Sequence, residues 1–288
     1  MRVLVTGASG MLGCTLVPFL ESQGHTIIRH SRNSPADVIC DLTNCAETSS
    51  MLEMVQPECL VNLVAATNVD ECERSPHSAY LLNTLVVENL VAGLAARDGM
   101  FLVQISTDQV YDSIGESNEG DVKLTNTYAL TKYAGELAAL RMRSAVLRTN
   151  FFGASMHPTR KSLSDWLLDN FCNRKKFTAF TDVKFTPLSI TTLCSVIEMV
   201  LRKQVVGVFN VGSHFGMSKA DFAETLAQVF QLSSASMLRG YSNDSSLEAY
   251  RPKNMCMNST KFEVAYGIAL PCLSNEIKQL SSETNDAA

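Results

Sequence analysis

Short apolar runs alternate with amphipathic segments through the first half of the chain. Residues 2–6 form an apolar run rich in β-branched side chains, which predicts a strand, and residues 12–20 follow with helical spacing after a glycine turn. Further strands are predicted at residues 26–29, 60–65, 100–106 and 145–148, and helices at residues 49–55, 79–96 and 128–141. This alternation predicts an α/β fold of the Rossmann type, a doubly wound parallel sheet with helices on both faces.

The second half of the chain has a less regular pattern. Residues 163–171 are spaced as a helix, and residues 208–211 form an apolar run that can rejoin the sheet. We therefore expect a first domain at residues 1–150, rejoined by parts of 183–212, and a smaller second lobe made mostly of residues 151–288.

The composition limits the classes of protein to which the chain can belong. Of its 288 residues, 46% are hydrophobic and 18% are charged, which is typical of a folded globular protein. A net charge of -5 without a long Lys/Arg run disfavours nucleic acid as a partner, and no apolar stretch approaches the roughly 20 residues that cross a membrane. Nine cysteines without a C-x-x-C pair predict reduced thiols in a cytoplasmic protein, with neither a disulfide framework nor a metal site.

A glycine-rich turn joins the first predicted strand to the first predicted helix. It reads Thr-Gly-Ala-Ser-Gly-Met-Leu-Gly over residues 6–13, with its glycines three apart. In a dinucleotide fold the first glycine allows the tight turn, the second lets backbone N–H groups approach the pyrophosphate, and the third lets the helix pack close to the strand. The positive end of the helix then faces the phosphates. The expected cofactor contacts here are Gly7, Ser9, Gly10, Met11, Leu12 and Gly13.

The end of the second predicted strand bears on which dinucleotide is bound. NAD-binding folds usually carry an acidic residue there, about 20 residues past the turn, to hold the ribose 2′-hydroxyl. This chain reads Arg-His-Ser-Arg over residues 29–32 instead, and a guanidinium suits the 2′-phosphate of NADP(H). The alternative is that both arginines only solvate a loop. We expect NADP(H) to be preferred over NAD(H). The expected contacts are Arg29, Ser31 and Arg32, with Asp41 and Leu42 toward the adenine.

A tyrosine and a lysine stand four residues apart on a predicted helix, so that Tyr128 and Lys132 project from one face. A nearby ammonium lowers the pKa of a tyrosine from about 10, which makes Tyr128 a usable acid near neutral pH. Thr107 ends the fourth predicted strand, at the edge where open α/β folds bind ligands. The spacing alone also fits a half-buried tyrosine beside a solvated lysine. We interpret Thr107, Tyr128 and Lys132 as catalytic residues. Tyr128 and Lys132 are also expected to contact the cofactor, with Lys132 anchoring the nicotinamide ribose.

Five segments together resemble the extended short-chain dehydrogenase/reductases, and most closely the dTDP-4-dehydrorhamnose reductase family. These segments are residues 5–13, residues 61–73 with Ala-Ala-Thr-Asn-Val-Asp at 65–70, residues 105–112 with Ser-Thr-Asp at 106–108, residues 126–136, and Arg-Pro-Lys-Asn at 251–254. The resemblance implies the same three catalytic residues. It also implies that Ala65 and Ala66 line the nicotinamide, that Thr67 and Asn83 lie on the cofactor side, and that Thr67 and Val69 approach the sugar.

The second lobe is expected to supply substrate specificity. Where the rhamnose enzymes commonly carry an aromatic residue and a tryptophan, this chain has Gln109 and Phe151, so its sugar contacts differ. An arginine that faces a nucleotide diphosphate has a sound physical reason, although Arg251 also fits a surface loop. The expected substrate contacts are Thr67, Val69, Thr107, Gln109, Asn150, Phe151 and Arg251, with Lys253 as a further candidate.

These residues predict an NADPH-dependent reductase that transfers hydride to the keto group of a nucleotide-linked 4-keto-6-deoxysugar. The expected partners are this nucleotide sugar and, as a candidate, a second copy of the chain in a homodimer. Two alternatives stay open. One is a nucleotide-sugar epimerase or dehydratase, which uses the same Tyr/Lys pair with tightly bound NAD. The other is a cofactor-binding regulatory subunit, because the family also resembles the β subunit of methionine adenosyltransferase.

Overall fold

The computed structural model describes residues 1–33, 35–94 and 99–286, which form two compact units. The first comprises Met1–Thr107, Asn126–Arg148 and Cys194–Phe209, and the second comprises Asp108–Thr125, Thr149–Leu193 and Asn210–Ala288. The first unit thus includes a late segment of the chain. Residues 108–125 belong to the second unit, whereas the sequence analysis assigned them to the first domain.

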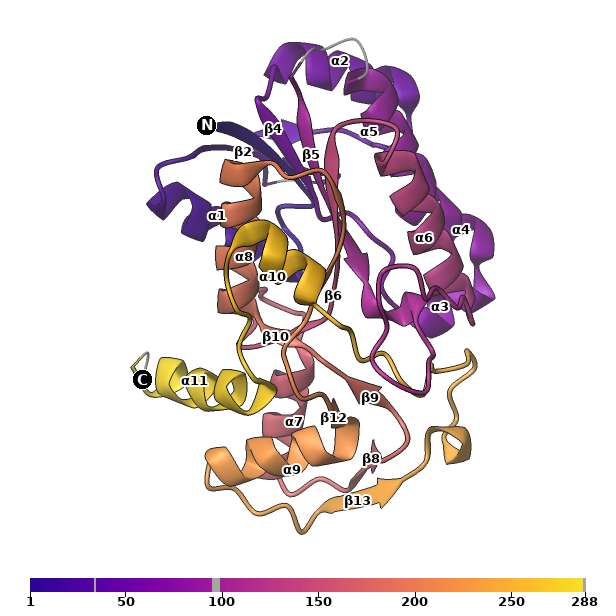
Figure 1. Cartoon of the computed structure of the whole chain (residues 1–288), viewed down its shortest axis with the longest axis vertical. Coiled ribbons are helices and arrows are strands. Elements are labelled where there is room, and N and C mark those ends of the chain that lie inside the picture. The colour runs from indigo at the N-terminus through magenta and orange to yellow at the C-terminus, as the bar shows by residue number, and fades with distance from the viewer. Residues whose placement is uncertain (34, 95–98, 287–288) are drawn as a thin grey trace. The chain divides into compact units, whose positions relative to one another are not determined.

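A parallel sheet forms the centre of the first unit (Figure 1). Its strands are β1 Arg2–Thr6, β2 Thr26–Ser31, β3 Val38–Ile39, β4 Cys59–Asn62, β5 Phe101–Thr107, β6 Ser144–Thr149 and β11 Gly207–Val211. Over the described ranges these seven strands have the order β11-β6-β5-β4-β1-β2-β3. The order switches direction between β1 and β4, which is where open α/β sheets bind ligands beyond the carboxyl ends of the strands. The doubly wound α/β fold is therefore confirmed.

Helices cover both faces of this sheet. Their bounds are α1 Met11–Ser22, α2 Cys45–Val55, α3 Val69–Arg74, α4 Pro76–Tyr80, α5 Val86–Leu94, α6 Thr127–Ala139 and α8 Ile190–Lys203. Figure 1 shows α1 and α8 on one side of the strands, and α2, α5 and α6 on the other. The helix predicted at residues 79–96 is divided between α4, a π-helical turn at Leu81–Leu85 and α5, and its last two residues lie outside the described residues.

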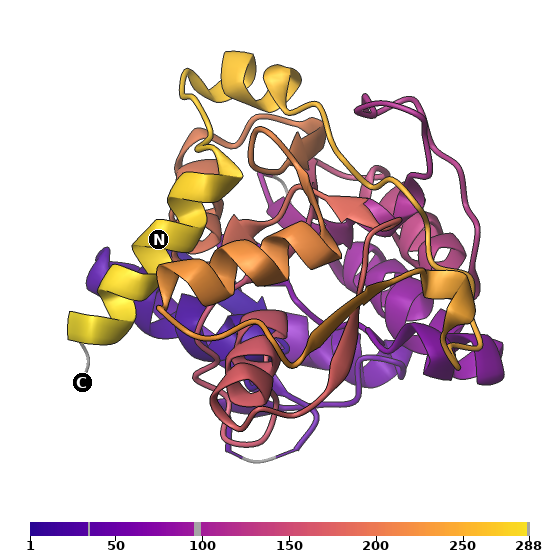
Figure 2. The ribbon, with the colours of Figure 1, turned by 90° about the horizontal axis from the view of Figure 1, so that it is seen from below.

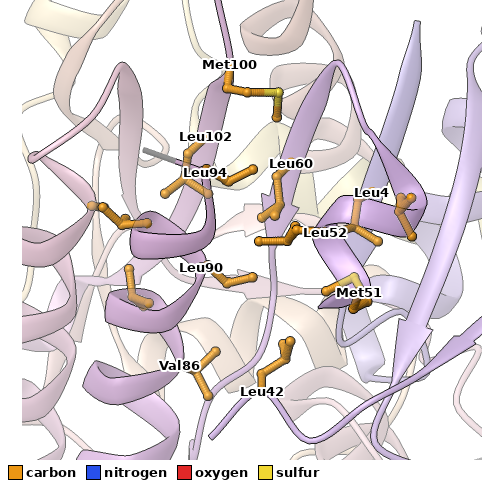
Figure 3. Close-up of a cluster of buried hydrophobic side chains, with 14 of the residues drawn as sticks. Leu4, Leu42, Met51, Leu52, Leu60, Val86, Leu90, Leu94, Met100 and Leu102 are labelled. Carbon is orange, nitrogen blue, oxygen red and sulfur yellow. The ribbon is translucent and has the colours of Figure 1, made fainter. Parts of the chain in front are cut away.

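Leucines of three neighbouring strands pack against the helices on one face of the sheet (Figure 3). Leu4, Leu60 and Leu102 occupy matching registers on β1, β4 and β5, and all three are fully buried. They belong to one apolar cluster with Leu52 of α2 and Leu90 of α5. Burying one such side chain contributes about 2 kcal/mol, so this cluster fixes the helices on the sheet and with them the carboxyl edge of the strands.

The second unit contains short strand pairs and helices. Their bounds are β7 Phe151–Phe152, α7 Leu163–Cys172, β8 Phe177–Phe180, β9 Lys184–Phe185, β10 Leu188–Ser189, β12 Met217–Ser218, α9 Lys219–Val229, β13 Met237–Gly240, α10 Thr260–Tyr266 and α11 Leu273–Asp286. β7 pairs with β10, β8 with β13 and β9 with β12. α9 packs against α7 and α11, and Figure 2 shows α9 beside α11. Phe222 of α9 is fully buried between Phe152 and Phe185, with both rings edge-on to it.

The glycine turn between β1 and α1 brings two backbone segments into close contact. Gly7 has a φ of +70°, a conformation that favours glycine, and its carbonyl oxygen accepts a 2.9 Å hydrogen bond from the N–H of Gly10. A Cβ on Gly13 would lie 2.4 Å from the carbonyl oxygen of Ala8, which is closer than real Cβ atoms approach an oxygen. The first turn of α1 can therefore sit on the glycine turn only if residue 13 has no side chain.

Gly13→Ala should lower the free energy of unfolding by about 2 kcal/mol, even though alanine is the better helix former. The cause is the contact with the Ala8 backbone, which can be relieved only by moving α1. Urea unfolding measures the change. Gly120→Ala is the matched control, because a Cβ there meets nothing within 4 Å, and its effect should stay within about 0.5 kcal/mol. Equal effects of the two substitutions would contradict this explanation.

Candidate active site

The first turn of α1 lies at the carboxyl end of β1 and presents backbone donors. Gly10 is the N-cap residue and has no side chain to accept from the first N–H groups, whereas Asn44 caps α2 and Asn126 caps α6 with their side chains. N–H groups left without a cap at a helix N-terminus bind anions, since the helix dipole adds positive potential there. The first N–H groups of α1 therefore lack a side-chain cap, and the pyrophosphate site over residues 6–13 stays a prediction.

The end of β2 distinguishes the two candidate arginines. Arg29 forms an ion pair with Glu21 of α1, and its backbone N–H donates to Asp37. Arg32 is exposed beyond the strand, and its charge helps to lower the pKa of Asp41. Ser31 is buried and donates its hydroxyl to the carbonyl oxygen of Asn33. The structure thus leaves Arg32 better placed than Arg29 for a ligand at the surface.

The two residues expected near the adenine have other partners in the structure. Asp41 accepts hydrogen bonds from the N–H and hydroxyl of Thr43, which, ahead of the Arg32 charge, hold its pKa below the usual range. The side chain of Leu42 is buried in the apolar cluster of the first unit, and its carbonyl oxygen accepts from Asn89 at 2.9 Å. Both residues therefore shape the loop after β3.

Asn83 holds the loop that follows β4. Its side-chain oxygen accepts from the N–H of Ala66 at 2.8 Å, and its amide group donates to the carbonyl oxygen of Ala66 and to the hydroxyl of Thr131. Asn83 is 1% exposed, and through these bonds it connects Ala66 to α6 and positions the loop. Thr67 is exposed on the same loop, and Val69 is buried as the first residue of α3.

The candidate catalytic residues all lie in the first unit. Lys132 is buried on α6, and its ammonium donates a 2.7 Å hydrogen bond to the carbonyl oxygen of Ile105 on β5. Burial lowers the pKa of Lys132 to about 8, while the carboxylate of Glu136 acts in the opposite direction. Tyr128, one turn earlier on α6, and Thr107, the last residue of β5, are also buried. The structure thus brings the lysine of α6 to a carbonyl two residues before Thr107.

A chain of buried hydrogen bonds connects β1 to the carbonyl that holds Lys132. The hydroxyl of Thr6 donates to Asn62 Oδ1 at 2.6 Å, Asn62 Nδ2 donates to Gln104 Oε1 at 2.8 Å, and Gln104 Nε2 donates to the Ile105 carbonyl at 3.0 Å. Thr6, Asn62 and Gln104 are at most 1% exposed. The sequence analysis did not assign Asn62 and Gln104, although polar residues within apolar strand runs were the available signal.

Glu136 and Arg148 form a buried ion pair next to Lys132. Arg148 Nη2 lies 2.6 Å from Glu136 Oε2, and Arg148 Nε bonds to both carboxylate oxygens at 3.0 and 3.1 Å. Ser106 donates its hydroxyl to the same carboxylate. Glu136 therefore has a full set of donors, and its charge is neutralised locally. Both members of the pair were outside the site that the sequence predicted.

The second unit holds the other expected substrate residues. Asn150 Nδ2 donates a 2.7 Å hydrogen bond to the buried carboxylate of Asp108. Gln109 follows Asp108 in the sequence, Phe151 follows Asn150, and both are partly exposed. The guanidinium of Arg251 donates to the carbonyl oxygen of Ala249 at 2.9 Å. Lys253 bonds to Asp182, Ser242 and Asn243, so it joins three loops of its own unit.

In residues 1–33, 35–94 and 99–286, no three His, Cys, Asp or Glu side chains are grouped so that they could hold a metal ion. Across those same ranges, none of the helices is long and apolar enough to span a membrane.

The doubly wound sheet, the glycine turn after β1 and the Tyr-x-x-x-Lys pair on α6 define an extended short-chain dehydrogenase/reductase. Comparison with known families is more specific. The RmlD substrate binding domain family matches residues 1–285, and the chain belongs to this family.

The relatives that resemble this chain are named for different functions. The chain is 26% identical to "Probable low-salt glycan biosynthesis reductase Agl14" of Haloferax volcanii, over 99% of each chain. It is 30% identical to "Methionine adenosyltransferase 2 subunit beta" of Mus musculus, over 91% of this chain and 81% of the relative. The crystal structure of a Bacillus anthracis dTDP-4-dehydrorhamnose reductase in complex with NADP has the same fold, with a TM-score of 0.89, 21% identity and coverage of 98% of this chain and 99% of the other.

Arg148→Met should destabilise the protein by about 3–5 kcal/mol, because it leaves the buried Glu136 carboxylate without its counter-charge. The double variant Arg148→Met/Glu136→Gln removes both charges and should recover much of this loss. Urea unfolding of the two single variants and the double variant forms a complete cycle. If the double variant is as unstable as the sum of the single ones, the two side chains do not act as a pair.

Proposed function

We propose that the chain is an NADPH-dependent reductase acting on the keto group of a nucleotide-linked 4-keto-6-deoxysugar. The observation that carries this proposal is the buried ammonium of Lys132, which is fixed on Ile105 and lies one helical turn from Tyr128. Perturbed, desolvated titratable groups at the ligand edge of an α/β sheet are typical of catalytic sites.

NADPH would supply the hydride for this reaction, and features of the first unit support its binding. Backbone donors at the uncapped start of α1 suit the pyrophosphate, and the glycine at position 13 permits the close packing of that helix. Arg32 is the candidate contact for the 2′-phosphate. The loop of Ala65 and Ala66, held by Asn83, is the candidate wall for the nicotinamide.

In the proposed mechanism, side chains of the first unit donate the proton and stabilise the charge that remains. Tyr128 donates its phenolic proton to the carbonyl oxygen of the sugar as the carbonyl carbon accepts the hydride, which gives an alcohol. The positive charge of Lys132 stabilises the phenolate that Tyr128 becomes. Thr107 donates a hydrogen bond to the same carbonyl oxygen and orients it. On the second unit, Asn150 and Phe151 are the candidate contacts for the sugar, and Arg251 for the diphosphate.

Tyr128→Phe should lower the turnover of a 4-keto-6-deoxy nucleotide sugar by at least about 100-fold, because the substitution removes the proton donor. The rate is followed by NADPH absorbance over a panel of dTDP- and UDP-linked 4-keto-6-deoxysugars. The dissociation constant of NADPH should change little, because the ring of residue 128 is retained. Tyr133→Phe, on the same helix, is the matched control and should turn over substrate like the parent. If no sugar in the panel is reduced, the proposed reaction is wrong.

Arg32→Ala should raise the dissociation constant of NADPH by about 10-fold or more and leave that of NADH nearly unchanged. A hydrogen bond to a charged group contributes about 1.5–3 kcal/mol. Arg29→Ala is the control, because Arg29 is paired with Glu21, and it should affect both dinucleotides alike. Fluorescence titration with NADPH and with NADH gives the dissociation constants, and each of the two variants is compared with the parent for each dinucleotide. Equal affinities of the parent for the two dinucleotides would overturn the preference for NADPH.

A regulatory subunit is the second candidate function. It is favoured by the 30% identity to the β subunit of methionine adenosyltransferase 2 from Mus musculus. Under this alternative the chain would bind a dinucleotide but reduce no sugar, and its Tyr128→Phe variant would be equivalent to the parent. The panel of sugars therefore separates the two functions.

A further inference from the structure

Lys219 has an unusual position in the second unit. It is the first residue of α9, whose N-cap Ser218 accepts from the N–H of Asp221. A positive charge at a helix N-terminus opposes the helix dipole and is unfavourable there. Local rules that are broken without a structural gain tend to mark functional positions.

The ammonium of Lys219 is packed against an aromatic ring. Its Nζ lies 3.2 Å from the centre of the Phe185 ring, and Phe185 is fully buried and edge-on to Phe222. β9, which carries Phe185, pairs with β12 directly before α9, so the ring is a fixed support. Cation–π contact of this kind holds a lysine in place but leaves its N–H donors available for other partners.

Charged partners for this lysine are scarce. Among the described residues, Lys219 Nζ makes neither an ion pair nor a hydrogen bond. Burial lowers the pKa of Lys219 to about 8, and the buried carboxylate of Asp108 acts in the opposite direction. That carboxylate accepts the 2.7 Å hydrogen bond from Asn150. The Asp108 carboxylate therefore acts electrostatically on Lys219 and is hydrogen-bonded to Asn150, a residue expected to contact the substrate.

We infer that Lys219, Asp108 and Asn150 form a subsite for the hydroxyl groups of a sugar ring, with Lys219 as the hydrogen-bond donor. This inference rests on the proposed function, since it names the part of the substrate that the second unit recognises. A sugar hydroxyl both accepts and donates, which matches an ammonium beside a carboxylate. A phosphate would be attracted by Lys219 but repelled by Asp108, so the near-neutral cluster favours the neutral sugar over the diphosphate.

Binding of unreacted nucleotide sugars tests the subsite without turnover. Calorimetric titrations of the NADPH-loaded protein use dTDP-glucose and UDP-glucose, each compared with its own nucleoside diphosphate. Lys219→Met should weaken the binding of both nucleotide sugars by about 10- to 100-fold and leave the binding of dTDP and UDP unchanged. The reason is that only the nucleotide sugars contain the hydroxyl groups of the hexose ring. Lys175→Met, at an exposed ion pair of the same unit, is the control and should change neither.

Folding of the variant is checked by its urea unfolding curve. Methionine retains the length of the lysine stem and removes a desolvated charge, so Lys219→Met should be at least as stable as the parent at pH 7. Lys219→Gln is a second variant, which keeps a donor without the charge and should show a smaller loss of affinity than Lys219→Met.

Each remaining outcome decides one of the two proposals. Unchanged affinity for both nucleotide sugars in Lys219→Met, or an equal loss for sugars and diphosphates, would overturn the sugar subsite. Binding of a nucleotide sugar by the parent, with the expected loss in Lys219→Met but without reduction of any ketosugar, would overturn the reductase and leave the subsite standing. If the parent binds neither nucleotide sugar, both proposals fail.

Discussion

The hydrogen bond from the Lys132 ammonium to the Ile105 carbonyl is the interaction on which the site depends. A buried ammonium without a partner would cost several kcal/mol, and this bond, with the nearby Glu136 charge, is what keeps Lys132 charged inside the first unit. The carbonyl in turn accepts from Gln104, so its direction is fixed from two sides. The Glu136 carboxylate is itself held in place by its ion pair with Arg148.

The same constraint connects the lysine to the glycine turn. Thr6, the residue before Gly7, is the first donor of the buried chain that runs through Asn62 and Gln104 to Ile105. Thr6 and Asn62 end β1 and β4, and Gln104 lies opposite Asn62 within β5, so these hydrogen bonds cross three adjacent parallel strands. Buried hydrogen bonds therefore connect two features of the first unit: the turn proposed to bind the cofactor and the lysine proposed to assist proton transfer.

Local patterns predicted the sheet because its strands are apolar and its turns carry glycine. β1, β5 and α6 lie within two residues of their predicted bounds, since burial on both faces of the sheet leaves a continuous apolar signal. β4 ends at Asn62, three residues before its predicted end at Ala65, because the apolar residues that follow form the loop after the strand. β3 was missed because two residues, Val38 and Ile39, carry too little pattern. The partners of Arg29 and Asn83, which are Glu21 and Ala66, could not be predicted from the sequence. These contacts form only when separate segments of the chain fold together. Lys219 was missed for the same reason.

Membership of a family does not decide between enzyme and regulatory subunit, because the names of its relatives include both. The energetics of Lys132 bear on that choice. A buried ammonium is less favourable than an apolar side chain of the same size, so packing alone does not account for Lys132. A proton donor next to that ammonium does gain, because the positive charge stabilises its conjugate base. The proposed proton transfer from Tyr128 would use that charge, but a dinucleotide contact would use it as well, so turnover of a ketosugar and not the presence of Lys132 separates the two functions.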